Sequence, residues 1–88
     1  MNTVSSWYVY MLECADNSLY TGVTTDLERR LVEHNETNKG ARYTRARRPV
    51  SLVYAEAAAS RSAALKRECA LKKLNVADKR ILISTAMK

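Results

Sequence analysis

The fold is decided by residues 7–23, which read WYVYMLECADNSLYTGV. Residues 7–12 are apolar at nearly every position and rich in strand formers, which predicts a strand covered on both faces. Residues 15–18, Ala-Asp-Asn-Ser, are turn formers, and residues 19–23 resume the strand pattern. We therefore predict a hairpin near the start of the chain.

A helix is predicted after the hairpin, over residues 26–37. Thr25 and Glu28 have the spacing of a capping box, with Thr25 as the N-cap. Asn38-Lys39-Gly40 ends this helix, and an irregular basic stretch follows as far as Pro49. A third strand over residues 50–55 begins directly after that proline.

Two further helices are predicted in the second half of the chain. Either Ser60 or Ser62 caps the first of them, which runs through about Leu74. Asn75 with Asp78 begins a short helix over 76–86, although the apolar run at 81–83 also fits a strand. The expected fold is α/β of the α+β type, a small and at least partly antiparallel sheet flanked by helices in the order ββαβαα.

The length and composition fit one compact domain. At 88 residues and 47% apolar composition, we expect a single domain over 1–88, with its core at about 7–74 and the last helix at 76–86. No apolar run is long enough to cross a bilayer, and residues 1–6 do not resemble a signal peptide. We therefore expect a cytoplasmic protein without a membrane partner. Cys14 and Cys69 are expected to be small buried hydrophobes.

The basic charge is concentrated in part of the chain. The net charge is +6, yet residues 1–38 hold two basic and six acidic side chains. Residues 39–48 carry no acid and have one tyrosine, Tyr43, that could stack on a base. This stretch predicts a loop that contacts nucleic-acid phosphates, without strong sequence specificity. Its basic residues are Lys39, Arg42, Arg45, Arg47 and Arg48.

One carboxylate lies where the helical pattern predicts an apolar residue. On the helix after Ser60, an arc of apolar residues that includes Ala64, Cys69 and Leu71 has Glu68 in its middle. Burying an unpaired charge costs several kcal/mol. Either Lys72 compensates the charge in an i,i+4 ion pair or by snorkelling at the edge of the arc, or Glu68 faces a metal ion or a polar cleft.

The first helix places polar residues beside its apolar stripe. Arg30 and His34 are four residues apart next to Leu27 and Leu31, and together they could grip a phosphate. The alternative is that Arg30 pairs with Glu33 or Asp26 and that His34 is an ordinary boundary residue. The strand tyrosines Tyr8, Tyr10 and Tyr20 are typical core aromatics, and Gly22 indicates close approach of another group to its strand.

Tyr8-Val9-Tyr10 and, nine residues later, Tyr20-Thr21-Gly22 resemble the two signature triplets of the GIY-YIG nuclease superfamily. The resemblance continues through Arg30, His34 and Glu68 and covers residues 7–74. Residues 40–49 look like the small stand-alone bacterial branch. Two positions depart from the signature: Tyr8 replaces the glycine of the first triplet, and Thr21 is the central residue of the second.

The resemblance implies a three-stranded antiparallel sheet and hydrolysis of DNA phosphodiesters with one divalent ion, Mg²⁺ or Mn²⁺. It assigns Tyr10 or Tyr20 as the general base, with its pKa lowered from about 10 by a nearby cation. Arg30 would stabilise the phosphate and His34 would orient the tyrosines or share their protons. Glu68 would be the only protein ligand of the metal.

We therefore expect a divalent-metal-dependent DNA endonuclease that selects structure or damage rather than sequence, with a role in DNA repair or processing. The alternative is a DNA- or RNA-binding module on the same fold without catalysis. Lys72 joins the basic loop among the predicted nucleic-acid contacts, and a monomer or weak dimer is expected. A pure binder would have no need for Glu68, which repels phosphate unless a metal intervenes.

Overall fold

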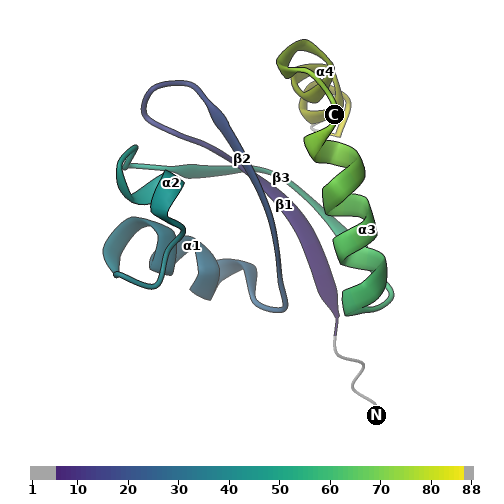
Figure 1. Cartoon of the computed structure of the whole chain (residues 1–88), viewed down its shortest axis with the longest axis horizontal. Helices are drawn as coiled ribbons and strands as arrows, with labels where there is room; N and C mark the ends of the chain where they lie inside the picture. Colours follow the sequence, from purple (N-terminus) through teal and green to yellow (C-terminus); the bar gives the residue numbers. More distant parts are fainter. Residues whose placement is uncertain (1–5, 87–88) are drawn as a thin grey trace.

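A computed structural model of the chain describes residues 6–86 and contains one three-stranded sheet. The strands are β1 (Trp7–Glu13), β2 (Leu19–Thr24) and β3 (Ser51–Ala58). Their order is β2-β1-β3, and β1 is antiparallel to both neighbours. The hairpin and the antiparallel sheet are confirmed, and the first strand of the chain is the central one (Figure 1).

Within residues 6–86, four helices accompany the sheet. They are α1 (Leu27–Glu36), α2 (Arg42–Arg45), α3 (Arg61–Lys72) and α4 (Val76–Ala86). Figure 1 shows α1 and α2 together on one side of the strands, with α3 on the other side and α4 beyond it. The predicted order ββαβαα holds, with α2 as an added single turn.

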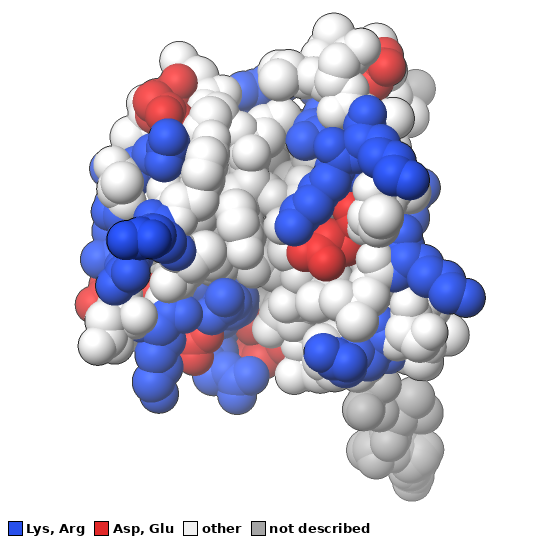
Figure 2. Space-filling model, in the orientation of Figure 1, with Lys and Arg blue, Asp and Glu red and all other residues white. Residues whose placement is uncertain are grey.

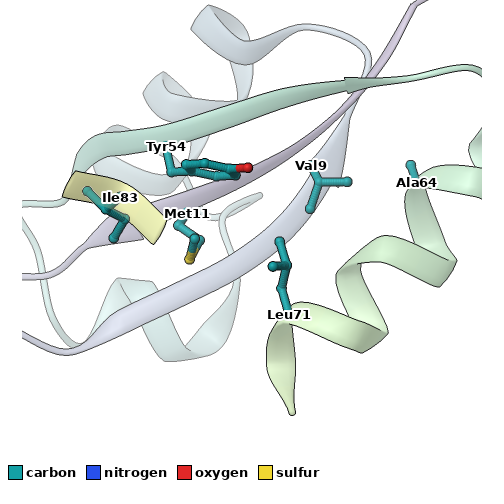
Figure 3. Close-up of a cluster of buried hydrophobic side chains, with 6 residues drawn as sticks. All are labelled: Val9, Met11, Tyr54, Ala64, Leu71 and Ile83. Atoms are coloured by element: carbon teal, nitrogen blue, oxygen red, sulfur yellow. The ribbon is translucent and has the colours of Figure 1, made fainter. Parts of the chain in front are cut away.

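Alternation along β1 divides the core into two layers. Val9 and Met11 face α3 and α4, where they pack with Leu71 and Ile83 (Figure 3). The intervening Tyr10 and Leu12 belong to a second cluster on the α1 side, which also receives Leu27 and Leu31 from α1. Because both faces are covered, β1 is apolar at nearly every position, as predicted.

The turn between β1 and β2 confirms the predicted turn chemistry. Asn17 adopts a positive φ of 69°, a conformation that asparagine tolerates better than most residues. The Asp16 carboxylate accepts hydrogen bonds from the Ser18 backbone N–H at 3.0 Å and from its hydroxyl at 2.5 Å. This local network sets the reversal that places Tyr10 of β1 opposite Gly22 of β2.

The predicted capping box at the start of α1 is wrong by one residue. Asp26, not Thr25, is the N-cap, and its carboxylate accepts the Arg29 backbone N–H at 3.0 Å. The hydroxyl of Thr24 accepts the Asp26 N–H at 3.1 Å and so holds Asp26 in the cap position. The helix ends at Glu36, and Thr37 is its C-cap.

Three other element predictions need correction. The stretch 39–48 is not wholly irregular, because α2 forms within it. Strand β3 continues to Ala58, since its small side chains pair along the full length of β1. Helix α3 begins after Ser60, whose hydroxyl accepts the Ala63 N–H, and it ends at Lys72 rather than Leu74.

Helix α4 matches its prediction. The side-chain oxygen of Asn75 accepts the Asp78 backbone N–H at 2.8 Å, so Asn75 begins the helix as expected. The apolar run at 81–83 is helical and not a strand. Its central position, Leu82, is partly buried, and Ile83 joins the core while Ile81 stays exposed.

The two cysteines differ in burial. Cys14 is buried, as predicted, whereas the prediction for Cys69 is wrong because its side chain is exposed. The inward face of α3 is narrower than the sequence indicated, and its buried residues are Ala64 and Leu71. Across residues 6–86, no helix has the length and apolar character that crossing a membrane requires.

Candidate active site

A buried chain of hydrogen bonds connects β1, α1 and α2. The Tyr10 hydroxyl lies 2.8 Å from His34 Nε2, and His34 Nδ1 lies 2.8 Å from the Thr44 hydroxyl. The Thr44 hydroxyl in turn donates to the Ala41 carbonyl at 2.8 Å. Tyr10 is 2% exposed, and both His34 and Thr44 are fully buried. The alternative that His34 is an ordinary boundary residue is therefore wrong.

These partners assign the proton positions along the chain. Thr44 gives its only hydroxyl proton to the Ala41 carbonyl, so its oxygen accepts the proton of His34 Nδ1. The Nε2 atom of His34 then carries no proton and accepts the Tyr10 O–H. The Ala41 N–H also points at Nδ1, at 3.3 Å; only the other tautomer could accept it, and the shorter contact with Thr44 decides the assignment. The phenol, imidazole and hydroxyl thus form one directional network.

Burial keeps both titratable members of this network uncharged. Desolvation lowers the pKa of His34 to about 4, and the nearby Arg30 charge acts in the same direction. Desolvation also raises the pKa of Tyr10 to about 12, although the Arg30 guanidinium opposes the rise. The expected lowering of a tyrosine pKa does not hold at Tyr10. At neutral pH its phenol is protonated and His34 is a neutral acceptor.

Two glycines allow the backbone to approach this network closely. A Cβ atom at Gly22 would lie 2.6 Å from the Tyr10 hydroxyl oxygen, so the predicted close approach is confirmed. A Cβ at Gly40 would lie 2.7 Å from both the Glu33 carbonyl oxygen and the His34 Cα. Gly22 therefore makes room for the Tyr10 ring, and Gly40 lets the loop after α1 pack against the helix backbone at His34.

Tyr20 and Tyr43 continue the aromatic cluster towards the surface. The Tyr20 ring centroid lies 5.2 Å from that of His34 and 6.4 Å from that of Tyr10. Tyr43 of α2 stacks on Tyr20 with centroids 6.2 Å apart and planes inclined by 26°. Arg47 places its Cζ atom 3.8 Å from the centroid of the Tyr43 ring. Tyr20 is half-buried and Tyr43 is 37% exposed, so solvent access increases outward along the stack.

Arg30 lies beside Tyr10 in the half-buried part of the site. Its Nη1 atom donates to Glu33 at 2.9 Å and to the Lys39 carbonyl at 2.9 Å. The pairing with Glu33 that we considered is therefore present. The same pairing lowers the pKa of the Glu33 carboxyl and helps to raise that of Arg30, so both groups are charged at neutral pH.

Glu68 of α3 is 19% exposed and pairs with Lys72 across one helical turn. The Lys72 Nζ atom lies 3.3 Å from a Glu68 carboxylate oxygen, and the lysine side chain is 54% exposed. The predicted ion pair is thus present. The Glu68 charge also helps to raise the pKa of Tyr10, so the carboxylate is near enough to act electrostatically on the tyrosine cluster. Within residues 6–86, no three potential metal-ligating side chains gather at one point.

Basic side chains gather on the face of the molecule that Figure 2 shows. Figure 2 shows lysines and arginines on both flanks of a hollowed strip without charge, in the orientation that sets α1 and α2 opposite α3. Lys39, Arg42 and Arg45 are exposed near one flank, and Lys72 is exposed on α3. All four are among the residues predicted to contact nucleic acid, and their exposure is compatible with that prediction.

Arg47 and Arg48 are already engaged in the protein. Arg47 donates to Asp16 at 3.1 Å and to the Tyr43 carbonyl at 3.0 Å. Arg48 donates to the carbonyl oxygens of His34 at 2.6 Å and Glu33 at 3.4 Å, and also to that of Thr37. These are carbonyls of the last turn of α1 and its C-cap, so Arg48 stabilises the helix end.

Two residues that organise the site were missed by the sequence analysis. Thr44 had no predicted role, yet it is the buried partner of His34. Asn35 makes two hydrogen bonds with the backbone of Val50, at 2.8 and 2.9 Å, and closes the base of the loop that carries α2. Neither role has a local signal, because each partner lies 10 or more positions away.

Comparisons with known proteins find matches that cover most of this chain. The family model of the GIY-YIG catalytic domain matches residues 6–81. A UPF0213 protein of Desulfotalea psychrophila is 54% identical over 83 residues, which are 94% of this chain and 76% of that protein. A UPF0213 protein of Syntrophus aciditrophicus is 52% identical over 80 residues, 91% of this chain and 92% of the relative.

Two solved structures are similar to this chain in fold. The solution NMR structure of a UPF0213 protein from Bacillus halodurans is 45% identical, with a TM-score of 0.58, and the match covers 91% of this chain and 84% of that one. The solution NMR structure of a protein from E. faecalis is 41% identical, with a TM-score of 0.62 and coverage of 100% and 94%. Both similarities extend over most of the sheet and helices described above.

Proposed function

The chain belongs to the GIY-YIG family, a nuclease superfamily, and from this premise we propose that it is a metal-dependent endonuclease acting on DNA. The observation that carries the proposal is that Tyr20 of β2 and Arg30 of α1 lie beside Tyr10 of β1, and that Glu68 of α3 is near enough to act on Tyr10 electrostatically. A module that only bound nucleic acid would not need a carboxylate among phosphate-binding cations.

The ligand set fits one hard divalent ion. Glu68 is a half-buried carboxylate whose partner, Lys72, is exposed enough to swing away when a cation arrives. Mg²⁺ and Mn²⁺ accept a site with one carboxylate when water and phosphate oxygens complete the coordination shell. When bound, the ion would neutralise a phosphate oxygen and stabilise the leaving oxygen.

Arg30 supplies fixed positive charge for the phosphate. Glu33 and the Lys39 carbonyl hold Nη1 and thereby fix the position of the guanidinium. We assign Nη2 and Nε to the scissile phosphate, whose negative charge increases as the attacking oxygen bonds to phosphorus. The charge is in place before the reaction, so little reorganisation is needed in the transition state.

The two tyrosines have different roles in this proposal. Tyr10 is 2% exposed, so its hydroxyl has almost no contact with solvent water. Its raised pKa also keeps the phenol protonated at neutral pH, so we do not assign it as the general base. We assign the half-buried Tyr20 to the attacking water: once its own hydroxyl proton has left to solvent, the phenolate oxygen accepts the water's hydrogen bond and takes its proton. Tyr10 and His34 are positioning residues, because they form the rigid wall against which Tyr20 packs.

A cleavage assay with a binding control tests the proposal. Supercoiled, branched and single-stranded DNA, and RNA, are incubated with Mg²⁺ or Mn²⁺ and, in parallel, with chelator. Glu68→Gln is expected to reduce cutting by roughly 100-fold or more while binding in chelator is retained. Glu36→Gln, an exposed carboxylate on α1, is the matched control and should cut normally.

Two results would overturn the proposal. Wild-type protein that binds nucleic acid but cuts none of these substrates with either metal would make it a binding module. Equal loss of activity in Glu68→Gln and Glu36→Gln would remove Glu68 from the reaction.

A further inference from the structure

Tyr43 is the outermost ring of the aromatic stack, and two groups contact the ring, Tyr20 and Arg47. One face packs on Tyr20, with centroids 6.2 Å apart. Arg47 lies over the ring, with its Cζ atom 3.8 Å from the centroid. Tyr43 is nevertheless 37% exposed, and the Arg47 side chain is also at the surface. A flat apolar ring is thus presented next to the proposed reaction centre, with a movable cation as its cover.

The polar contacts that keep Arg47 over the ring are exposed to solvent: an ion pair with Asp16 and a hydrogen bond from its Nη1 atom to the Tyr43 carbonyl at 3.0 Å. Its ion pair with Asp16 is partly exposed on both sides, and such pairs contribute little because water screens them. A cation over an exposed tyrosine adds a similarly small amount. Stacking of a nucleobase on an aromatic side chain changes affinity by roughly 5- to 150-fold. An unpaired base can therefore displace the guanidinium, which gains a phosphate partner when it leaves.

We propose that Tyr43 is a stacking subsite for an unpaired nucleobase, covered by Arg47 in the free protein and exposed when Arg47 moves to the nucleic-acid backbone. The base must be unpaired or extruded, because within a duplex its faces are occupied by its neighbours. Tyr20 separates this subsite from Tyr10 by one ring, so the stacked base would lie within about one nucleotide of the phosphate at Tyr20.

This inference deepens the proposed function, since it names the substrate class: a nucleic acid with an unpaired nucleotide beside the strand that enters the site. It rests on nucleic-acid binding and not on cleavage. The two proposals can therefore fail separately, provided that the stacking is measured in chelator, where the strand stays intact.

The test uses 2-aminopurine, a fluorescent adenine analogue that stacking quenches. It is placed in a single-stranded or gapped oligonucleotide, and in a fully paired duplex as the reference, with EDTA present. Wild-type protein and Tyr43→Phe are expected to quench the unpaired probe. Tyr43→Leu should lose the quenching and bind the unpaired probe roughly 5- to 150-fold more weakly, with little change on the duplex.

Control variants separate stacking from folding. Ile81→Ala removes another exposed apolar side chain, on α4, and should behave as wild type. Quenching that persists in Tyr43→Leu, or an equal loss of affinity for paired and unpaired probes, would overturn the proposal. If Tyr43→Leu does not fold, Tyr43→Phe still decides: a phenyl ring that fails to quench would also overturn it.

Arg47→Gln tests the covering role. This variant removes the cation from the ring. We expect quenching of the unpaired probe to be retained, because no guanidinium has to leave the Tyr43 ring before the base can stack on it. Affinity should become less salt-dependent, because one phosphate contact is lost. If Arg47→Gln abolished the quenching, the base would stack on the guanidinium itself, and the displacement that we propose would be wrong.

Discussion

Thr21 is the residue at which the fold leaves a polar atom unsatisfied. Among residues 6–86 its hydroxyl oxygen is a buried side-chain atom without a hydrogen-bond partner. Thr21 lies opposite Met11 in the β1–β2 pair and is 3% exposed. A buried hydroxyl that has lost its water costs free energy without a compensating bond.

Replacing this hydroxyl with a methyl group should stabilise the protein. Thr21→Val has nearly the same shape, so we expect the free energy of unfolding to rise by about 1 kcal/mol. For a domain of this size that corresponds to roughly 4–8 °C in melting temperature. Thr85→Val is the control, because the Thr85 hydroxyl is exposed and donates to the Ile81 carbonyl. A lower melting temperature for Thr21→Val would show that the hydroxyl has a partner.

His34 links the stability of the fold to pH. Its pKa is about 4 in the folded state and close to 6.5 in the unfolded chain, so the unfolded chain binds more protons between these values. Stability is therefore complete above pH 6.5 and decreases as the pH falls towards 4. Between pH 6.5 and 5 the free energy of unfolding should fall by about 1.5 kcal/mol.

Urea denaturation at several pH values measures this dependence. His34 is the only histidine, and carboxylates titrate below this range, so the slope belongs to one group. His34→Gln should be less stable overall but flat between pH 6.5 and 5. An unchanged slope in that variant would contradict the assignment.

At the scale of elements, the loop between α1 and β3 is held at its base by polar contacts. Asn35 bonds the backbone of Val50, and Arg48 bonds carbonyl oxygens at the end of α1. The loop can therefore place α2, and with it Thr44, against His34 although it has few apolar residues of its own.

Arg48 and Arg42 should respond differently to truncation. Arg48→Ala leaves the α1 carbonyls without their charged partner, so we expect a loss of about 2 kcal/mol in the free energy of unfolding. Arg42→Ala removes an exposed side chain and should leave stability nearly unchanged. Chemical denaturation of both variants compares them. Equal stabilities would mean that Arg48 is dispensable at the helix end.

The elements that could be predicted are those with a strong local pattern. The hairpin follows from two runs of strand-forming residues on either side of turn formers, and α4 follows from the Asn75 cap. The start of α1 was misplaced because Thr25 and Asp26 are adjacent and both can cap. Helix α2 was missed because four residues are too few to show a helical period.

The site itself could be predicted only in part. The resemblance indicated Tyr10, Tyr20 and His34, and the structure brings their rings together. The burial of His34 could not be foreseen, because it depends on Thr44, which packs against it from a loop 10 positions away. The exposure of Cys69 depends likewise on how α3 is rotated against the sheet.

For the molecule as a whole, charge placement predicts how binding responds to salt. Arg42 and Arg45 lie on the flank formed by α2, and we expect each to neutralise one phosphate. The double variant Arg42→Ala/Arg45→Ala should reduce the slope of log affinity against log salt by about 2 for duplex DNA.

A matched variant on α3 provides the control. At 100° per residue, Lys66 of α3 and Lys73, its C-cap, lie on the opposite side of the helix from Glu68. Lys66→Gln/Lys73→Gln removes the same number of charges, so it should leave the slope almost unchanged. Anisotropy titrations over a range of salt concentrations compare the two. Equal slopes would indicate that the net charge alone drives binding.

The division of β1 between two layers has a consequence for protein engineering. Neighbouring positions of this strand place their side chains on opposite faces of the sheet. Val9 and Met11 pack with apolar residues under α3 and α4, whereas Tyr10 packs on the α1 side beside Tyr20. A library randomised at positions 9 and 11 therefore varies the packing under α3 and α4, whereas one at position 10 varies the packing on the α1 side together with the hydrogen bond to His34. The two layers can thus be redesigned separately along one seven-residue segment, with stability measured for both because Tyr10 is also a core residue.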